Sequence, residues 1–406
     1  MTAKSHVRLS DIRGYSRLAI DATIGLTDLV ESMHRNIARV PGVFGAAATE
    51  RTTGITGLVY RSIRGVTRLV GGGIDAVLAQ LLPLVGDVAS STEREAVIAA
   101  LNGVLGDHIA VSANPLAISM RLRRDGQPLD LASQSLAAAI PDPSAKILLL
   151  AHGLCMNDLQ WRRKGHDHGA AVAAAAAFTP VYLHYNSGLH VSINGRAFAG
   201  LLEDLLHAWP VPVRELVIIG HSMGGLLARS ACHYGRLAGH AWLQHLRKIV
   251  FLGTPHHGAP LERGGNWVDI ILGASPYSAA FARLGKIRSA GITDLRYGCL
   301  VDEDWEHRDR FARAEDNRLA VPLPQAVRCY AVGASIAKKA GAMREGVVGD
   351  GLVPLRSALG QHADPRLSLA IPQSQQWIAY GMNHLDLLDS AEVYARLHNW
   401  LSRPSS

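Results

Sequence analysis

The sequence predicts an α/β protein in which a mostly parallel central sheet carries helices on both of its faces. Apolar runs of strand length alternate with helical patterns from residue 116 onward, which is typical of this class. One such run, residues 216–219, leads through the turn GHSMG at 220–224 directly into a helical pattern. A length of 406 residues with 48% apolar residues is sufficient for one large domain and an additional segment.

The turn around Ser222 is the most specific motif in the chain. A G-x-S-x-G turn between a buried strand and a helix lifts the serine hydroxyl clear of the sheet, provided that the residues two before and two after it lack a bulky Cβ. Gly220 and Gly224 meet this requirement, and His221 lies beside the serine. Because the following helix directs its N-terminus at any oxyanion formed there, the pattern predicts a nucleophile elbow.

A serine hydroxyl becomes a nucleophile only when a general base lies within hydrogen-bond reach and an acid orients that base. Asp350 lies beyond a strand predicted at 327–332, and His384 follows a strand predicted at 367–371. The chain order is therefore serine, acid, histidine, with each residue on a loop after a strand. We predict that Asp350 orients His384 and that His384 takes the proton of Ser222.

Other ionisable residues downstream fit these roles less well. His362 lies in a polar loop before the last predicted strand, where a base is not expected. Asp386 is only two residues past His384 and is poorly placed to orient that ring. The acidic cluster at 302–304 is interpreted as a solvated face.

Two backbone N–H groups are needed to hold an oxyanion. Met223, the residue after the serine, supplies one, and Leu154, after the strand predicted at 146–150, supplies the other. His152 is interpreted as a structural residue of that loop. The histidines at 166–168 and 256–257 have no convincing further ligand, so packing or pocket lining is favoured over a metal site, and no cofactor is predicted.

Residues 1–113 are predicted to form an N-terminal helical segment. Residues 1–18 are polar and are expected to be loosely held, and helices are predicted at 19–40, at 53–82 and from Thr92 onward. The second of these helices is basic and amphipathic. It could pack on protein, including a second subunit of a homodimer, or lie on a membrane surface.

Residues 114–402 are predicted to form the catalytic domain, which opens with a hairpin whose first strand spans 116–124. Residues 262–325 break the strand–helix alternation and are a candidate lid or cap. The formal charge of +7 accompanies no nucleic-acid motif. Four scattered cysteines, together with the lack of a signal-peptide pattern or a long apolar span, predict a cytoplasmic protein, with peripheral membrane contact left open.

Five short motifs, taken in order, resemble those of the bacterial true lipases and of the GPI-inositol-deacylase-like hydrolases of the α/β-hydrolase superfamily. They are HGL (152–154), GHSMGG (220–225), GTPH (253–256), DGLV (350–353) and NHLD (383–386). The resemblance covers about residues 116–402 and implies the α/β-hydrolase fold with a mobile lid. It also implies ester hydrolysis through an acyl-enzyme, often on lipids. The N-terminal segment has no counterpart in the secreted lipases, and the ligands of their structural calcium cannot be placed here.

The sequence therefore favours a carboxylesterase or lipase that acts on a small-molecule or lipid ester. Two further functions stay open. The same residues could transfer the acyl group to an alcohol or thiol, or depolymerise an intracellular polyester. Alternatively, the helical N-terminus could make the chain a membrane-associated or scaffolding module with a relict site.

Overall fold

The computed structural model describes residues 10–22, 24, 75, 92–259, 289–308, 316–339 and 349–403. Contacts divide the chain into two units, one of Met1–Arg94 with Ile109–Ala117 and the other of Glu95–His108 with Ile118–Ser406. The second unit contains the whole sheet. It also includes most of the helix α3 (Thr92–Val111), while the domain boundary after residue 113 stays a prediction.

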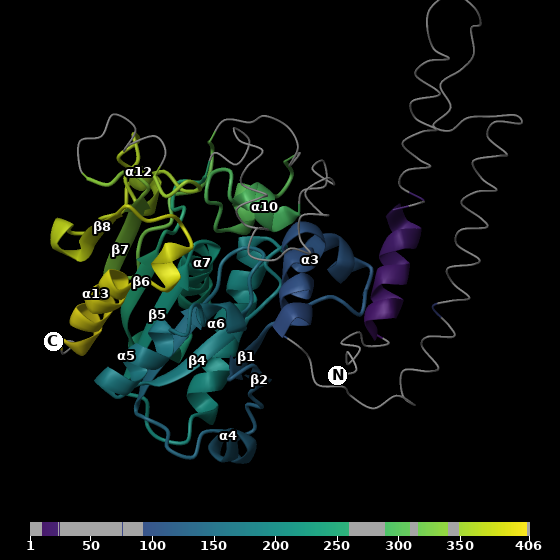
Figure 1. Cartoon of the computed structure of the whole chain (residues 1–406), viewed down its shortest axis with the longest axis horizontal. Helices are drawn as coiled ribbons and strands as arrows, with labels where there is room; N and C mark the ends of the chain where they lie inside the picture. Colours follow the sequence, from purple (N-terminus) through teal and green to yellow (C-terminus); the bar gives the residue numbers. More distant parts are fainter. Residues whose placement is uncertain are drawn as a thin grey trace, which may run out of the picture. The chain divides into compact units, whose positions relative to one another are not determined.

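The sheet has eight strands in the spatial order β2-β1-β4-β3-β5-β6-β7-β8 (Figure 1). The strand β1 pairs antiparallel with β2 and β4, and all other neighbouring strands are parallel. The strands are β1 (Arg121–Arg124), β2 (Gln127–Pro128), β3 (Lys146–Ala151), β4 (Thr179–His184), β5 (Glu215–His221), β6 (Leu246–Leu252), β7 (Arg328–Ser335) and β8 (Gln376–Tyr380). This confirms the predicted mostly parallel sheet.

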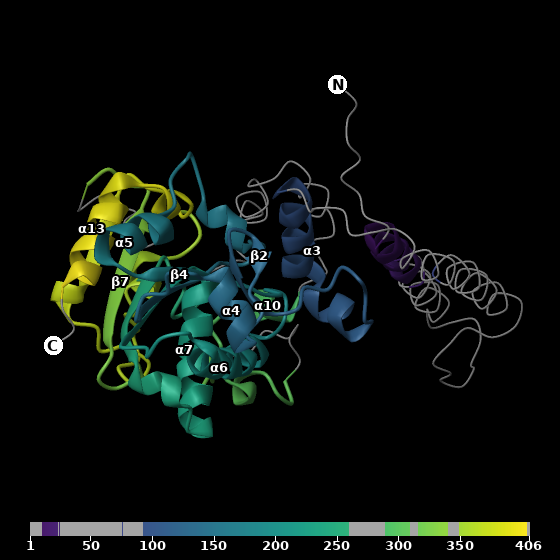
Figure 2. The same ribbon diagram turned by 90° about the horizontal axis from the view of Figure 1, so that it is seen from below.

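Helices cover both faces of the sheet, with α5 and α13 on one side and α6 and α7 on the other (Figure 2). The described helices after α3 are α4 (Ser133–Ala139), α5 (His168–Ala176), α6 (Val191–Ala208), α7 (Met223–Ala238), α10 (Ala290–Asp294), α12 (Leu355–Ala358) and α13 (Ala391–Ser402). Short 3₁₀ turns occupy Asp158–Trp161, Ala241–Gln244, Asp302–Asp304, Gln373–Gln375 and Asp386–Leu388.

The two layers of the core follow from the alternation of side chains along each strand. Leu149 of β3 packs in one cluster with Phe198 of α6 and residues of α7. Its neighbour Leu148 packs in the other cluster, together with Leu397 of α13 and residues of α5. Because the central strands are buried on both faces, their sequences are continuous apolar runs.

The parallel strands bring the loops of interest to one edge. The segments after β3, β5, β6 and β8 and the residues beyond β7 all lie at the carboxyl ends of the strands. Ligands of open α/β sheets bind at this edge.

Two predicted strands need correction. Residues 367–371 are not a strand, because Leu369 N–H donates to Gly360 O at 2.8 Å and Pro372 follows directly. The last strand is β8 instead. The hairpin strand predicted at 116–124 is confined to β1, since the N–H of Ile118 donates to the Asn102 side chain at 2.9 Å.

In the N-terminal unit, the expected loose conformation of 1–18 is wrong from residue 10 onward, because residues 10–22 are helical. Asp75 accepts hydrogen bonds from Arg13 and Arg17, each at 2.6 Å. The predicted start of a helix at Thr92 is confirmed by α3.

Several predictions lie outside the described residues: most of the helices at 19–40 and 53–82, and much of the candidate lid at 262–325. The described part of that insertion contains α10 and the turn Asp302–Asp304. No helix in the described ranges combines the length and apolar character needed to cross a bilayer.

Candidate active site

Ser222 lies at the turn between β5 and α7 with φ 54° and ψ −124°. A positive φ at a residue other than glycine costs of order 1–3 kcal/mol and persists only where the surroundings hold it. Two backbone hydrogen bonds do so here, from Ser222 N to Leu252 O at 2.8 Å and from Gly225 N to Ser222 O at 3.1 Å. The serine is therefore held in a strained, fixed conformation at the carboxyl edge of the sheet.

Close backbone approach explains why this turn is rich in glycine. A Cβ on Gly220 would lie 2.5 Å from Gly225 N, and one on Gly224 would lie 2.2 Å from Ala151 O. A Cβ on Gly225 would meet the Thr254 hydroxyl oxygen at 1.9 Å. The shape of the turn accounts for Gly220 and Gly224, but no sequence pattern pointed to Gly225, because Thr254 lies in the loop after the neighbouring strand β6.

We expect Gly224→Ala to lower the free energy of unfolding by at least about 1–3 kcal/mol, the usual cost of forcing extra atoms into a packed region. Gly200→Ala is the matched control. It lies within α6, nothing lies within 4 Å of its added Cβ, and it should stabilise by up to about 1 kcal/mol. Urea unfolding of both variants measures the difference, and equal stabilities would contradict the close packing.

Asp350 and His384 lie in direct contact. The Nδ1 atom of His384 is 2.6 Å from Oδ2 of Asp350, and both residues are buried. The other carboxylate oxygen of Asp350 accepts the backbone N–H groups of Leu352 and Val353 at 2.9 and 2.8 Å. Because three donors fix the carboxylate, it can orient the imidazole and stabilise a positive charge on it.

Ser222 and His384 line one small cavity of about 30 Å³. Leu154, at the carboxyl end of β3, lines the same cavity. Met223 is the first residue of α7, and the first N–H groups of a helix have no acceptor within it.

His221 supports the backbone beside the imidazole of His384. Its Nε2 lies 3.2 Å from the carbonyl oxygen of His384. Burial lowers the pKa of His221 well below its usual value, so the ring is neutral. Since a carbonyl only accepts, Nε2 carries the proton and donates it. The turn motif predicts the position of His221 but not this contact, which joins residues 163 positions apart.

Two glycines outside the elbow also leave room for the side chains of Ser222 and His384. A Cβ on Gly153 would lie 3.0 Å from the Ser222 Cβ, and one on Gly253 would lie 3.0 Å from Cε1 of His384. Gly153 belongs to the HGL motif and Gly253 to the GTPH motif. Their spacing in the sequence gave no sign of these neighbours.

His152 lies outside the Asp350–His384 pair. Its ring stacks on Tyr185 with centroids 4.3 Å apart, and burial lowers its pKa to about 3. The Tyr185 hydroxyl donates to His152 O at 2.9 Å. These contacts agree with a residue that holds the loop after β3.

The remaining candidates lie elsewhere. His166 and His168 contact each other at 2.8 Å, and His168 also contacts Leu387 O, as packing residues do. His362 lies beside Asp316 rather than Asp350. The interpretation of 302–304 as a solvated face is wrong for Asp304, which is buried. Its carboxylate accepts the N–H groups of Leu300, Val301 and Leu319 in place of water. In the described ranges, no group of three or more His, Cys, Asp or Glu residues is placed to hold a metal ion.

The buried histidines predict a loss of stability in acid. Burial holds the pKa of His152 at about 3 and those of His221 and His256 well below 6.5, so only the unfolded chain takes up their protons near pH 6. The contribution of these histidines to the free energy of unfolding is therefore complete above pH 6.5. It falls as the pH drops towards their pKa values in the folded state. We expect about 1 kcal/mol to be lost per histidine for each pH unit below that point. Urea unfolding between about pH 7 and 5 measures this loss, and an unchanged free energy would contradict it.

A sheet of this strand order, with one antiparallel edge and a serine at the strained turn after β5, defines the α/β-hydrolase fold. This chain has that fold. Residues 201–326, which include the Ser222 turn, match the family described as the PGAP1-like alpha/beta domain.

Similar solved structures include the mature lipase BlEst2 of Bacillus licheniformis, with 16% identity over 70% of this chain and 98% of that chain and a TM-score of 0.41. Lipase B of Aspergillus fumigatus has 12% identity over 64% of this chain and 53% of that chain, with a TM-score of 0.40. An esterase of Pyrobaculum calidifontis has 13% identity over 64% of this chain and 76% of that chain, with a TM-score of 0.38. No curated protein matches the chain.

Proposed function

We propose that this chain hydrolyses carboxylic esters with Ser222 as nucleophile, His384 as general base and Asp350 as the acid that orients His384. The observation that carries the proposal is the buried 2.6 Å contact between His384 Nδ1 and Asp350, with His384 and the strained Ser222 lining the same cavity. The five motifs that resemble those of bacterial lipases and related hydrolases also support it.

In the first half-reaction, the Ser222 oxygen attacks the ester carbonyl carbon while Nε2 of His384 takes the hydroxyl proton. Asp350 stabilises the resulting imidazolium, and the N–H groups of Met223 and Leu154 donate to the oxyanion. The C–O bond to the leaving alcohol then breaks as His384 returns the proton to it. An acyl-enzyme on Ser222 is left.

Water completes the cycle. His384 removes a proton from the water as its oxygen attacks the acyl carbon, and the proton passes to the Ser222 oxygen as the carboxylic acid leaves. An alcohol or a thiol in place of water would make the same residues an acyltransferase. The substrate is a small-molecule or lipid ester whose acyl length is set by side chains around the cavity.

A fluorophosphonate probe tests the proposal on the full chain. We expect stoichiometric phosphonylation of Ser222, located by peptide mass spectrometry, with parallel loss of p-nitrophenyl butyrate hydrolysis. Heat-unfolded protein is the control, because the free serine hydroxyl is unreactive without its base. A folded protein that neither labels at Ser222 nor hydrolyses any ester of a chain-length panel would refute the proposal. Product analysis with added alcohol separates hydrolysis from acyl transfer.

A further inference from the structure

A second cavity, of about 460 Å³, lies next to the loop that follows β6. Pro255 and Ala259 of this loop line the Ser222 cavity, whereas His256 and His257 between them line the larger one. The two cavities share no lining residue among those described. The larger cavity is therefore a separate site from the proposed catalytic one.

The lining of this cavity is strongly basic. It contains Arg229, Arg318, Arg328 and Arg366, and the described lining residues include no aspartate or glutamate. Guanidinium groups in a concave site attract an anion where their charge is not already paired with a carboxylate.

Arg229 of α7 is the most unusual of these residues. It is buried, its Nη2 donates to Val321 O at 2.7 Å, and its Nη1 lies 3.3 Å from His256 Nδ1. Its Nε has no acceptor, and no carboxylate of the described residues forms an ion pair with it. Burial, followed by the charge of Arg318, lowers its pKa to about 9. A buried charge without a partner costs several kcal/mol, which a bound anion would recover.

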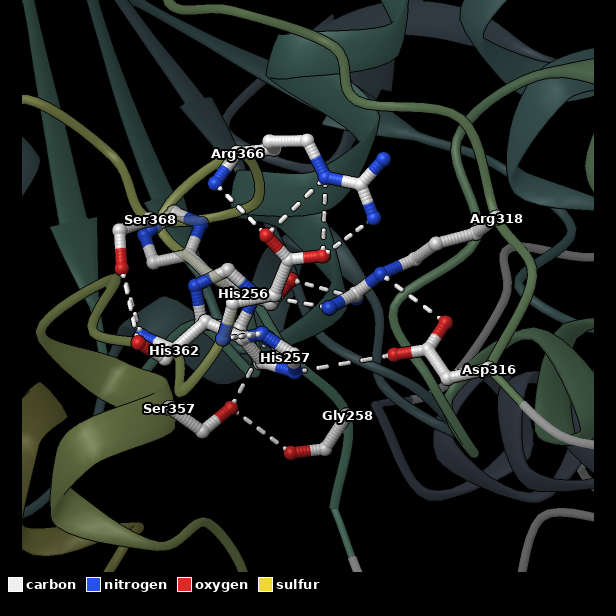
Figure 3. Close-up of polar contacts among 10 residues, drawn as sticks. His256, His257, Gly258, Asp316, Arg318, Ser357, His362, Arg366 and Ser368 are labelled. Atoms are coloured by element: carbon white, nitrogen blue, oxygen red, sulfur yellow. Dashed lines mark hydrogen bonds and ion pairs between the residues drawn. The ribbon is translucent and has the colours of Figure 1, made fainter.

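Arg318 presents a second guanidinium, buried and held in place. Its Nη1 donates to His256 O at 3.0 Å and its Nη2 to His257 Nδ1 at 2.9 Å, while Asp316 lies 3.4 Å from Nε (Figure 3). Asp316 thus offsets Arg318, and the backbone N–H groups already described occupy both oxygens of Asp304. Neither carboxylate pairs with Arg229.

The rest of the lining differs in character. Arg366 is exposed and its guanidinium pairs with the carboxylate of Asp364, so Arg366 lies at the open side of the cavity. The other lining residues are largely apolar and include Leu300, Val321, Leu323, Leu367 and Leu369. Two guanidiniums beside apolar side chains suit a ligand with a charged head and an apolar body.

We propose that this cavity binds an organic oxyanion, with a carboxylate or phosphate head facing Arg229 and Arg318 and an apolar body against Leu300 and Val321. The head accepts guanidinium N–H groups and supplies the counter-charge that Arg229 lacks. Binding requires no chemistry at Ser222, so the proposal stands or falls independently of ester hydrolysis.

Calorimetric titration of the full chain tests this site, with octyl phosphate and octanoate kept below the concentrations at which they form micelles. We expect one molecule to bind per chain with at least one of these probes. Inorganic phosphate, which lacks the apolar body, and octanol, which lacks the charge, should bind at least about tenfold more weakly. Preference for one amphiphile over the other identifies the head group.

Five variants, two of which are exposed controls, locate the binding. Arg229→Gln and Arg318→Gln should each weaken it at least about tenfold, whereas Arg236→Gln, an exposed arginine on α7, should leave it unchanged. Leu319→Glu adds a negative charge at an exposed lining position and should weaken binding about fivefold or more, against Leu237→Glu as its exposed control. The Leu319 pair keeps the test valid if the buried variants fail to fold.

Absence of binding by both amphiphiles would overturn the proposal. So would equal binding by wild type and Leu319→Glu, which is the result expected if the probes occupy the Ser222 cavity. Octanol that binds as tightly as the anions would show an apolar site without anion recognition, and this result would also overturn it.

Discussion

Replacing Ser222 with alanine is expected to lower kcat for p-nitrophenyl butyrate by about 10⁵- to 10⁶-fold, the loss that removal of a serine nucleophile produces in hydrolases of this mechanism. Without the hydroxyl, no acyl-enzyme forms, and only substrate binding and the oxyanion contacts are left to promote attack by water. The variant removes one hydroxyl and adds no atoms, and alanine carries the same Cβ, so the backbone strain at this position is unchanged. We therefore expect it to fold with a thermal midpoint close to that of the wild type.

Ser402→Ala, at the exposed end of α13, is the matched control and should retain wild-type kcat. A steady-state assay with active-site titration separates a slow enzyme from a small contaminating fraction. If the folded Ser222→Ala protein kept more than about a hundredth of the wild-type kcat, a different nucleophile would have to be sought.

Asp350→Asn is expected to lower kcat by about 10⁴-fold, as exchange of the orienting carboxylate does in serine hydrolases. The amide oxygen can still accept from Leu352 and Val353, so the loop should keep its shape. Its NH₂ group, however, would face Nδ1 of His384 and force the other tautomer, which places the proton on Nε2, where the base must be free. The variant should therefore fold but be unable to deprotonate Ser222.

Asp386→Asn is the control for this prediction, since Asp386 is the rival acid closest in sequence to His384. Its carboxylate accepts the N–H of Asn383 at 2.9 Å, and we expect a change in kcat of less than about threefold. Measuring both variants against pH shows which carboxylate orients the base. A large loss in Asp386→Asn with an active Asp350→Asn would reverse the assignment.

Most of the sheet could be predicted because its signals are local. The apolar runs in β3, β5 and β6 are continuous, since strands buried on both faces need no polar residues. The error at 367–371 arose because leucines there alternate as in a strand, although they pack as a loop beside Gly360. His384 nevertheless kept its place after the last strand, because β8 follows that loop and precedes the histidine.

The order of Ser222, Asp350 and His384 in the chain predicted that Asp350 orients His384. Only the fold shows that the two side chains are in contact. Conversely, no pattern linked Arg229 with Arg318. One lies on the buried face of α7, and the other lies in an irregular segment before β7. An arginine within a helical pattern is normally solvated. Only the tertiary structure shows that Arg229 is buried and that no carboxylate of the described residues pairs with it.

The sequence by itself determined most of the buried strands and which serine occupies the tight turn, because apolar runs and glycine positions act over a few residues. The tertiary structure alone decided that Thr254 requires Gly225, that His221 supports His384, and that the arginines surround one cavity. These features depend on contacts between loops that have no periodicity, and their partners are chosen by the packing of the whole sheet.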